Sequence, residues 1–237
     1  MNRRTFMQKT GLIMSGLTLS PLIGKSYSSI YGQTAPSNKV KVALIGCRSM
    51  GYGDLNTFLD YPETECVALC DVDDEWLNKR AADVEKKTGK KVPHLYKDWR
   101  RVIDNKDVDV VIIGTPDHWH CLPTVWACQA GKDVYVEKPL SNTIEECNLM
   151  EKAARKYNRI VQVGQWQRSD PHWDEAVNYL KAGNIGRIRT VKVWAYQDSK
   201  PTLPIIPDSP VPAGVDYDMW LGPAPKRPFN TLSLIHI

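Results

Sequence analysis

The chain has 237 residues, enough for one large domain or two small ones with a packed core. The net charge of +4 arises at the N-terminus, because residues 1–32 hold four of the 31 basic residues and no acidic ones. The remainder therefore balances 27 basic against 27 acidic groups. It contains no basic stripe with interleaved aromatic residues, which argues against nucleic acid as a partner.

The N-terminus has the pattern of an export signal. Twin arginines in "NRRTFMQ" (2–8) precede an uncharged stretch over 10–24 that is too short for a membrane span, which needs about 20 apolar residues. The pattern resembles a twin-arginine signal, so we expect residues 1–36 to be signal and linker. Export to the periplasm or cell envelope by the twin-arginine machinery would follow. A disordered basic tail is the alternative.

The six cysteines form no C-x-x-C pair and no spacing typical of a metal site. Most lie in apolar runs, where a free thiol acts as a small hydrophobic group. We therefore expect no metal, and a protein that folds in a reducing compartment before export.

From residue 39, short β-branched runs alternate with amphipathic stretches, which predicts βαβ units on a parallel sheet. The predicted strands are 39–45, 65–70, 94–96, 108–114, 133–136 and 160–163. The predicted helices are 50–60, 73–88, 99–105, 120–130, 143–157 and 171–182. Thr143 and Glu146 have the spacing of a capping box, and Gly131 and Gly183 lie where helices should end.

After Gly186 the sequence changes character. The alternation of apolar and polar residues over 187–197 predicts a strand that opens a second domain. Residues 201–228 contain eight of the 16 prolines, which predicts a long ordered loop without helix or central strand. Residues 232–237, "LSLIHI", resemble a translated sequencing adapter, so we expect a non-native tail on a truncated protein.

The stretch "VALIGCRSMG" (42–51) predicts a strand, a turn and a helix start, the context of a pyrophosphate-binding turn. Gly46 allows the tight turn, and Gly51 allows the helix to approach the strand closely. Arg48 replaces the middle glycine of G-x-G-x-x-G, so its Cβ hinders backbone approach while its guanidinium is able to reach a phosphate. Ser49 and Met50 complete the predicted cofactor-binding turn, because free N–H groups at a helix start bind phosphate.

Asp71 follows the second predicted strand, 20 residues after Gly51. A carboxylate there accepts hydrogen bonds from the ribose hydroxyls of NAD and repels the 2′-phosphate of NADP, so we expect NAD as the cofactor and NADP less readily. Capping of the next helix is the alternative role, which Asp73 is equally able to fill.

The stretch "TPDHWH" (115–120) follows the most apolar predicted strand, at the end where ligands bind in parallel sheets. We expect Thr115, Pro116 and His118 to contact the cofactor and His120 to contact the substrate. Two alternatives remain open. The histidines are a possible H-x-H metal pair, although no third ligand has a fitting spacing, or they bind backbone carbonyls at a helix start.

The stretch "VEKPL" (136–140) ends a predicted buried strand with Glu137, Lys138 and Pro139. Alone it would be an ordinary solvated strand end. After the three preceding motifs it indicates a catalytic lysine in the cofactor crevice, able to bind a substrate hydroxyl or exchange a proton with it. Glu137 would orient Lys138 and contact the cofactor.

Together these four stretches resemble the Gfo/Idh/MocA oxidoreductases, the relatives of glucose–fructose oxidoreductase and inositol dehydrogenase. The resemblance covers about residues 39–230 and includes "VGQWQRS" (163–169) and "DMWLGPAP" (218–225). It implies an α/β fold: a doubly wound parallel Rossmann domain over 37–166, then over 167–231 the start of an α/β domain with a largely antiparallel open sheet. The full-length form would be a homo-oligomer.

The resemblance also implies NAD(P)-dependent oxidation or reduction of a sugar, polyol or related secondary alcohol. It implies that Lys138 binds substrate and relays the proton, that Gln165 lies near the cofactor, and that Arg168 lies near the substrate, with a surface salt bridge as the alternative for Arg168. The Asp and His that complete the site in that family would follow residue 230, so this fragment should not turn over. His172 is not assigned to replace them.

Two other functions remain open. One is an NAD-dependent glycosidase that oxidises its sugar transiently and eliminates the glycosidic group, although relatives with that activity tend to lack the lysine of E-K-P. The other is a non-catalytic sugar- or nucleotide-binding protein with the same fold.

Overall fold

The computed structural model describes residues 39–194 and 205–234. Apart from Lys39, the described residues belong to one compact unit, Val40–Ile237. The expected signal and linker (1–36) lie outside the described residues, as do 195–204 and 235–237.

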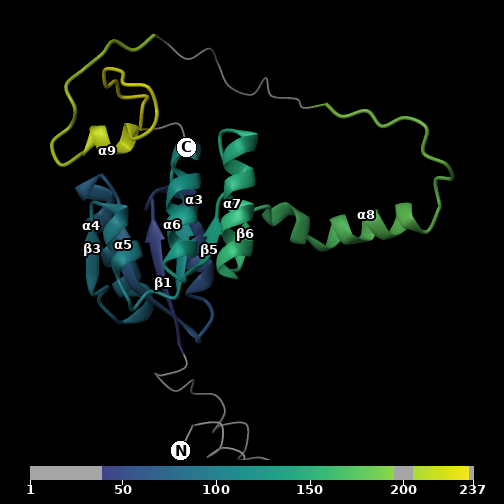
Figure 1. The fold of residues 1–237 in the computed structure, drawn as a ribbon, viewed down its shortest axis with the longest axis horizontal. Coiled ribbons are helices and arrows are strands. Elements are labelled where there is room, and N and C mark those ends of the chain that lie inside the picture. Colours follow the sequence, from purple (N-terminus) through teal and green to yellow (C-terminus); the bar gives the residue numbers. More distant parts are fainter. Residues whose placement is uncertain (1–38, 195–204, 235–237) are drawn as a thin grey trace, which may run out of the picture. The chain divides into compact units, whose positions relative to one another are not determined.

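Six parallel strands form the sheet at the centre of the fold (Figure 1). They are β1 (Val40–Ile45), β2 (Thr64–Cys70), β3 (His94–Tyr96), β4 (Val110–Ile113), β5 (Asp133–Val136) and β6 (Val161–Val163). The strand order β3-β2-β1-β4-β5-β6 reverses between β1 and β4, which is the doubly wound order of a Rossmann fold. The predicted parallel α/β fold is confirmed, and each strand lies within two residues of its predicted bounds.

The helices between the strands also match the predicted ranges closely. They are α3 (Ser49–Phe58), α4 (Asp74–Thr88), α5 (Trp99–Asp104), α6 (Cys121–Gln129), α7 (Ile144–Tyr157) and α8 (Pro171–Lys181). Two short 3-10 turns, η3 (Asp117–Trp119) and η4 (Trp166–Ser169), and one further helix, α9 (Tyr217–Leu221), complete the described elements.

Alternating strand residues divide the core into two layers. Val42 and Leu44 of β1 pack with Leu55 of α3 on one face of the sheet. Ala43 and Ile45 face the other way, into the layer formed with α5, α6 and α7. Successive strand side chains point to opposite faces, and residues 42–45 of β1 are all apolar because helices cover both faces of the sheet.

Side-chain caps explain where two of the helices begin. The Asp73 carboxylate accepts a hydrogen bond from the Glu75 N–H at 3.0 Å and begins α4. The Thr143 hydroxyl accepts one from the Glu146 N–H at 3.2 Å and begins α7. The predicted capping box is only half formed, because the Glu146 carboxylate accepts from the Ser141 hydroxyl at 2.7 Å instead.

Two predictions for the second half of the chain are wrong over the described residues. Residues 187–194 form no strand, and Val191 and Val193 are 74% and 91% exposed. A strand requires a neighbour for its N–H and C=O groups, and no described segment pairs with this one. The proline-rich stretch also contains a helix, α9, because its prolines leave 213–222 free and Asp216 caps the helix by accepting from the Met219 N–H at 2.9 Å.

The described residues contain no helix that is long and apolar enough to cross a membrane. They also contain no group of three or more histidine, cysteine or acidic side chains placed to hold a metal ion. All six cysteines are free thiols, and all except Cys147 are buried. Burial raises the pKa of the Cys66 thiol to about 12 and that of Cys128 to about 11, so these thiols serve as packing groups.

Candidate functional site

The ends of the strands lie side by side at one edge of the sheet. Ile45 pairs with Cys70 and with Ile113, and Ile113 pairs with Val136. The turns that follow these strands therefore lie next to one another. They carry the four motifs that the sequence analysis selected, so the site is assembled by strand register.

The glycine turn after β1 is packed against the end of β4. Gly46 has φ +87°, and a Cβ there would lie 2.6 Å from the Gly114 carbonyl oxygen. A Cβ on Gly51 would lie 2.2 Å from the Gly46 carbonyl oxygen. The roles expected for Gly46 and Gly51 thus have a direct geometric cause, and Gly114 is a third member that the sequence analysis missed.

The first turn of α3 presents its backbone N–H groups at this edge. Ser49, Met50 and Gly51 occupy the first helical positions, where N–H groups have no partner within the helix. Arg48 makes no side-chain cap and the first turn holds no acidic residue. The positive end of α3 is therefore free to bind an anion.

Asp71 and Asp73 have separate tasks at the end of β2. Asp71 is 8% exposed, and its carboxylate accepts hydrogen bonds from the Cys47 N–H at 2.6 Å and the Asp73 N–H at 3.0 Å. Burial raises the pKa of Asp71, and the two N–H donors oppose that rise. Asp71 lines a pocket at this edge of the sheet, together with Gly46, Arg48, Thr115 and Pro116. Because Asp73 caps α4, the Asp71 carboxylate keeps spare lone pairs for further donors.

Arg48 reaches across the glycine turn. Its guanidinium donates to the Asp73 carboxylate at 2.6 Å and to the Leu234 carbonyl at 2.7 Å, and it lies 5.1 Å from the centre of the Trp76 ring. The expected contact with a phosphate would require Arg48 to leave these partners. The structure places it over the pocket but binds it to protein groups.

The turn after β4 holds helix α9. The His118 Nε2 lies 2.8 Å from the Trp220 carbonyl oxygen, and the Trp119 indole donates to the Met219 carbonyl at 2.9 Å. Gly222 is in contact with the Trp119 ring, which a Cβ at 222 would overlap at 2.0 Å. Thr115 and Pro116 line the pocket together with Trp220, whereas His118 faces α9, and the expected cofactor contacts of these residues stay predictions.

His120 is completely buried, with 0% exposure. Its Nδ1 lies 2.7 Å from the Pro139 carbonyl oxygen and its Nε2 lies 2.9 Å from the Thr115 carbonyl oxygen. The expected substrate contact does not fit this position, because both ring nitrogens and the whole ring are enclosed by protein. His120 instead joins the turn after β4 to the turn after β5, as the backbone-carbonyl alternative had it.

Glu137 and Lys138 behave oppositely at the end of β5. Glu137 is 4% exposed and its Oε1 has no hydrogen-bond partner among the described residues. Burial raises its pKa, and the positive charge of Lys138 opposes that rise. Lys138 is exposed, and its peptide bond to Pro139 is cis. The lysine is therefore accessible to a substrate, while the glutamate beneath it is enclosed.

Gln165 and Arg168 follow β6 and have exposed side chains. In the described part of the chain Arg168 forms no ion pair, so the salt-bridge alternative has no partner there. His172 lies in the first turn of α8, with 5.3 Å between the centres of its ring and that of Trp173.

These residues fit a dinucleotide on three observations. The glycine turn that leads into α3 packs against backbone more closely than a Cβ would allow, the first turn of α3 offers free N–H groups, and the buried Thr115 hydroxyl has no hydrogen-bond partner among the described residues. A buried polar atom without a partner costs free energy, which a bound ligand would recover.

Sequence reasoning missed Asp54 on α3. Asp54 has a buried oxygen without a partner in the described structure, and burial followed by the charge of Glu137 raises its pKa to about 7. Its position three residues after Gly51 gave a signal, because residues i and i+3 share a helix face and Gly51 faces the sheet.

The fold and the glycine turn define the class of Rossmann-fold nucleotide-binding proteins. Residues 40–165 match the Gfo/Idh/MocA family, described as an oxidoreductase family with an NAD-binding Rossmann fold, and the chain belongs to that family.

Relatives and solved structures agree with this membership. A glycosyl hydrolase family 109 protein from Shewanella sp. (strain ANA-3) is 29% identical over 165 residues, which covers 62% of this chain and 35% of the relative. An NAD-binding oxidoreductase from Klebsiella pneumoniae is 29% identical with a TM-score of 0.54, covering 62% of this chain and 40% of that one. The myo-inositol 2-dehydrogenase from Lactobacillus plantarum is 27% identical with a TM-score of 0.56, covering 63% and 43%. The chain spans about a third of the length of the curated relatives it matches.

Proposed function

We propose that this chain carries the cofactor domain of an NAD(P)-dependent oxidoreductase that acts on a sugar, polyol or related secondary alcohol. One observation carries the proposal: strand register brings the glycine turn, Asp71 and the Glu137–Lys138 turn to the same edge of the sheet. The myo-inositol 2-dehydrogenase with the same fold supports the alcohol as substrate class.

The glycine turn and the first turn of α3 would hold the pyrophosphate, since N–H groups at a helix start favour negative charge. Asp71 would accept hydrogen bonds from the ribose hydroxyls and repel a 2′-phosphate, which favours NAD over NADP. When bound, the nicotinamide supplies the acceptor or donor of hydride.

Lys138 would serve the substrate side. Its side chain is exposed next to the buried Glu137, so its amine is able to bind the reacting hydroxyl and take part in the path of its proton. The resemblance of "VEKPL" to the family's E-K-P stretch supports this role. Arg168, exposed after β6, would help to bind the same substrate.

The cofactor half of the proposal is tested by calorimetric titration of the 237-residue chain with NAD⁺ and NADP⁺. We expect NAD⁺ to bind more tightly, and Asp71→Asn to weaken NAD⁺ binding by about tenfold, as loss of a charged hydrogen-bond acceptor should. Asp60→Asn is the matched control, because Asp60 is exposed and its ion pair with Lys87 is its only one within the described structure. Equal NAD⁺ affinity in Asp71→Asn and the unmodified chain would contradict the assigned role.

The substrate half is tested with the full-length protein, by NADH-linked turnover on a panel of sugars and polyols. Lys138→Ala should lower kcat by about a hundredfold or more while the affinity for NAD⁺ stays within about twofold. Unchanged turnover in Lys138→Ala would favour the non-catalytic binding protein instead.

A second candidate function is an NAD-dependent glycosidase. The curated relatives named glycosyl hydrolase family 109 proteins favour it, whereas the lysine of E-K-P in this chain favours the dehydrogenase. Parallel assays distinguish the two: a dehydrogenase accumulates NADH with its substrate, whereas the glycosidase releases the glycosidic group without net change in NADH.

The proposed route to the cell envelope is a separate matter. Replacement of Arg3 and Arg4 by lysine should retain the protein in the cytoplasm if the twin-arginine signal operates. Genomic sequence running uninterrupted through codons 232–237 to a stop would refute the proposed non-native tail.

A further inference from the structure

Two carboxyl groups, the buried Glu137 and the partly buried Asp54, each have an enclosed oxygen without a hydrogen-bond partner among the described residues. Glu137 is 4% exposed, and its Oε1 has no hydrogen-bond partner among the described residues. Asp54 on α3 likewise has a buried Oδ2 without a partner there. A buried charged group without a partner is costly, so a pair of them calls for a physical compensation.

The packing of α3 directs Asp54 toward β5. Phe58, one turn after Asp54 on the same helix, packs edge-on against the Tyr135 ring with 5.7 Å between ring centres. Residues i and i+4 share a helix face, so Asp54 faces the same strand. Asp54 lies beyond the first turn of α3, where the positive helix end contributes little.

Gly164 closes the opposite side of the pair. A Cβ at Gly164 would lie 2.1 Å from the Glu137 Oε1 and 3.0 Å from the Tyr135 hydroxyl oxygen. The β6 turn is therefore packed directly onto the Glu137 carboxyl. A cation would have to share this space with the Gly164 backbone, whereas a proton needs no space.

The charged and titratable groups around the pair are few. Tyr135 of β5 faces both carboxyls, whose negative charges, together with burial as the larger cause, raise its pKa to about 12. Burial raises the pKa of Glu137, and the charges of Lys138 and His120 oppose that rise. No cation among the described residues acts on Asp54, and burial followed by the charge of Glu137 raises its pKa to about 7.

We propose that Asp54 and Glu137 form a carboxyl pair that holds one shared proton at neutral pH and thereby sets the charge beside Lys138. The pair carries one negative charge when the proton is present and two when it is lost. Asp54 is thus a positioning residue, since it acts on the Lys138 turn through Glu137. The inference deepens the proposed function, on which the importance of Lys138 rests.

The test is a titration of the 237-residue chain by ¹³C NMR, with labelled Asp, Glu and Lys side chains. We expect one carboxyl to titrate near pH 7 and its transition to disappear in Asp54→Asn. In Glu137→Gln the Asp54 midpoint should fall without reaching the ordinary range, because burial persists. The Lys138 Cε resonance, identified by its loss in Lys138→Arg, should shift with the same midpoint and lose this shift in Asp54→Asn.

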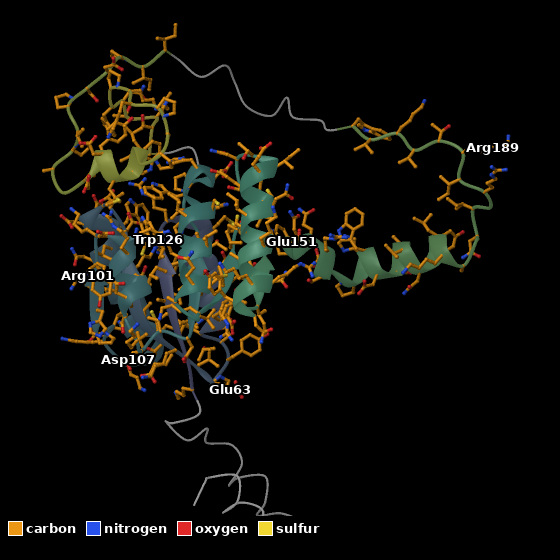
Figure 2. All side chains as sticks on the ribbon, viewed as in Figure 1. Glu63, Arg101, Asp107, Trp126, Glu151 and Arg189 are labelled. Carbon is orange, nitrogen blue, oxygen red and sulfur yellow. The ribbon has the colours of Figure 1, made fainter. Side chains whose placement is uncertain are left out.

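Glu151→Gln is the matched control, because Glu151 lies on the exposed face of α7 (Figure 2) and, among the residues that the structure describes, pairs with Arg155 alone. It should leave the transition near pH 7 unchanged. Titration of every carboxyl in the ordinary acidic range would overturn the proposal, as would a neutral transition that survives Asp54→Asn or a Lys138 resonance that ignores it. The unmodified chain answers the first question even if a variant fails to fold. Failure of dinucleotide binding would count against the proposed function alone.

Discussion

The two halves of the sheet edge satisfy their polar groups in different ways. On the glycine side, formed by Gly46, Gly51, Asp71 and Asp73, each carboxylate accepts backbone N–H groups or the Arg48 guanidinium. On the lysine side, formed by Thr115, Glu137, Lys138 and Asp54, three buried oxygen atoms have no partner within the described residues.

This difference indicates that the glycine side keeps one geometry without a ligand, whereas the lysine side has hydrogen-bond positions that a ligand is able to fill. Filled hydrogen-bond positions and backbone contact hold the glycine side in one geometry without any ligand. The unfilled positions of the lysine side cost stability, and such costs concentrate where a protein binds or reacts. Mutations at the two sides should therefore have effects of different kinds.

A substitution on the glycine side should cause the largest loss in the free energy of unfolding. In Gly51→Ala the new Cβ would lie 2.2 Å from the Gly46 carbonyl oxygen, a backbone atom that cannot rotate away. We expect a loss of about 3 kcal/mol or more in the free energy of unfolding, measured by urea denaturation. Gly53→Ala is the control on the same helix, where a Cβ meets nothing within 4 Å, and it should stabilise by about 0.5–1 kcal/mol. Similar stabilities of the two variants would refute the close contact.

Loss of His120, which joins the turns after β4 and β5, should have the second-largest effect on stability. His120→Ala removes both contacts of the buried ring and leaves the Thr115 and Pro139 carbonyls without this partner. We expect a loss of about 2–4 kcal/mol from the cavity and the lost hydrogen bonds, again by urea denaturation. His172→Ala, at an exposed histidine, should change the stability by less than about 0.5 kcal/mol. A mild effect of His120→Ala would mean that the two turns do not depend on each other.

A pH dependence sharpens the comparison on the lysine side. The folded-state pKa of Asp54 is raised from 3.8 to about 7, so the folded protein binds a proton that the unfolded chain releases above pH 4. Stability from this group is therefore full below about pH 4, falls as the pH rises toward 7, and stays low above it. Asp54→Asn cannot ionise, so relative to the unmodified chain it should be more stable at pH 8 than at pH 5.

The size of that difference should be about 1 kcal/mol, because partial exposure of Asp54 screens the interaction. Urea denaturation at the two pH values measures it. Parallel pH profiles for Asp54→Asn and the unmodified chain would show that Asp54 is ionised at neutral pH after all.

The smallest effect should come from the ion pair over the glycine turn. Arg48 and Asp73 have side-chain exposures of 26% and 11%, and Arg48→Met should cost about 1 kcal/mol or less. The more informative measurement is the affinity for NAD⁺. A several-fold loss in Arg48→Met would show that the guanidinium leaves Asp73 for the phosphates, and an unchanged or higher affinity would show that it only covers the pocket.

Local patterns in the sequence were enough to predict a Rossmann fold and the segments that form the site. The apolar strand runs, the turn residues Gly46 and Gly51 and the cap Asp73 act over a few residues, so their pattern is visible in one dimension. The doubly wound strand order was implied by the family resemblance, because the hand of the crossovers fixes the face that each helix covers and not the order of the strands. Glu137 and Lys138 were found because both directly follow a buried strand.

The contacts of the selected side chains could not be predicted in this way, because they depend on how distant segments pack. His120 is a buried link because the turn after β5 brings the Pro139 carbonyl to its ring. His118 contacts α9, which lies about 100 residues later in the sequence. Asp54 gained importance from Glu137 and Gly164, which lie on other elements. The strand predicted at 187–197 failed over its described part because a strand needs a partner, and a periodic pattern carries no information about whether one is present. Burial and pairing depend on residues distant in sequence, whereas propensity and periodicity depend on neighbours.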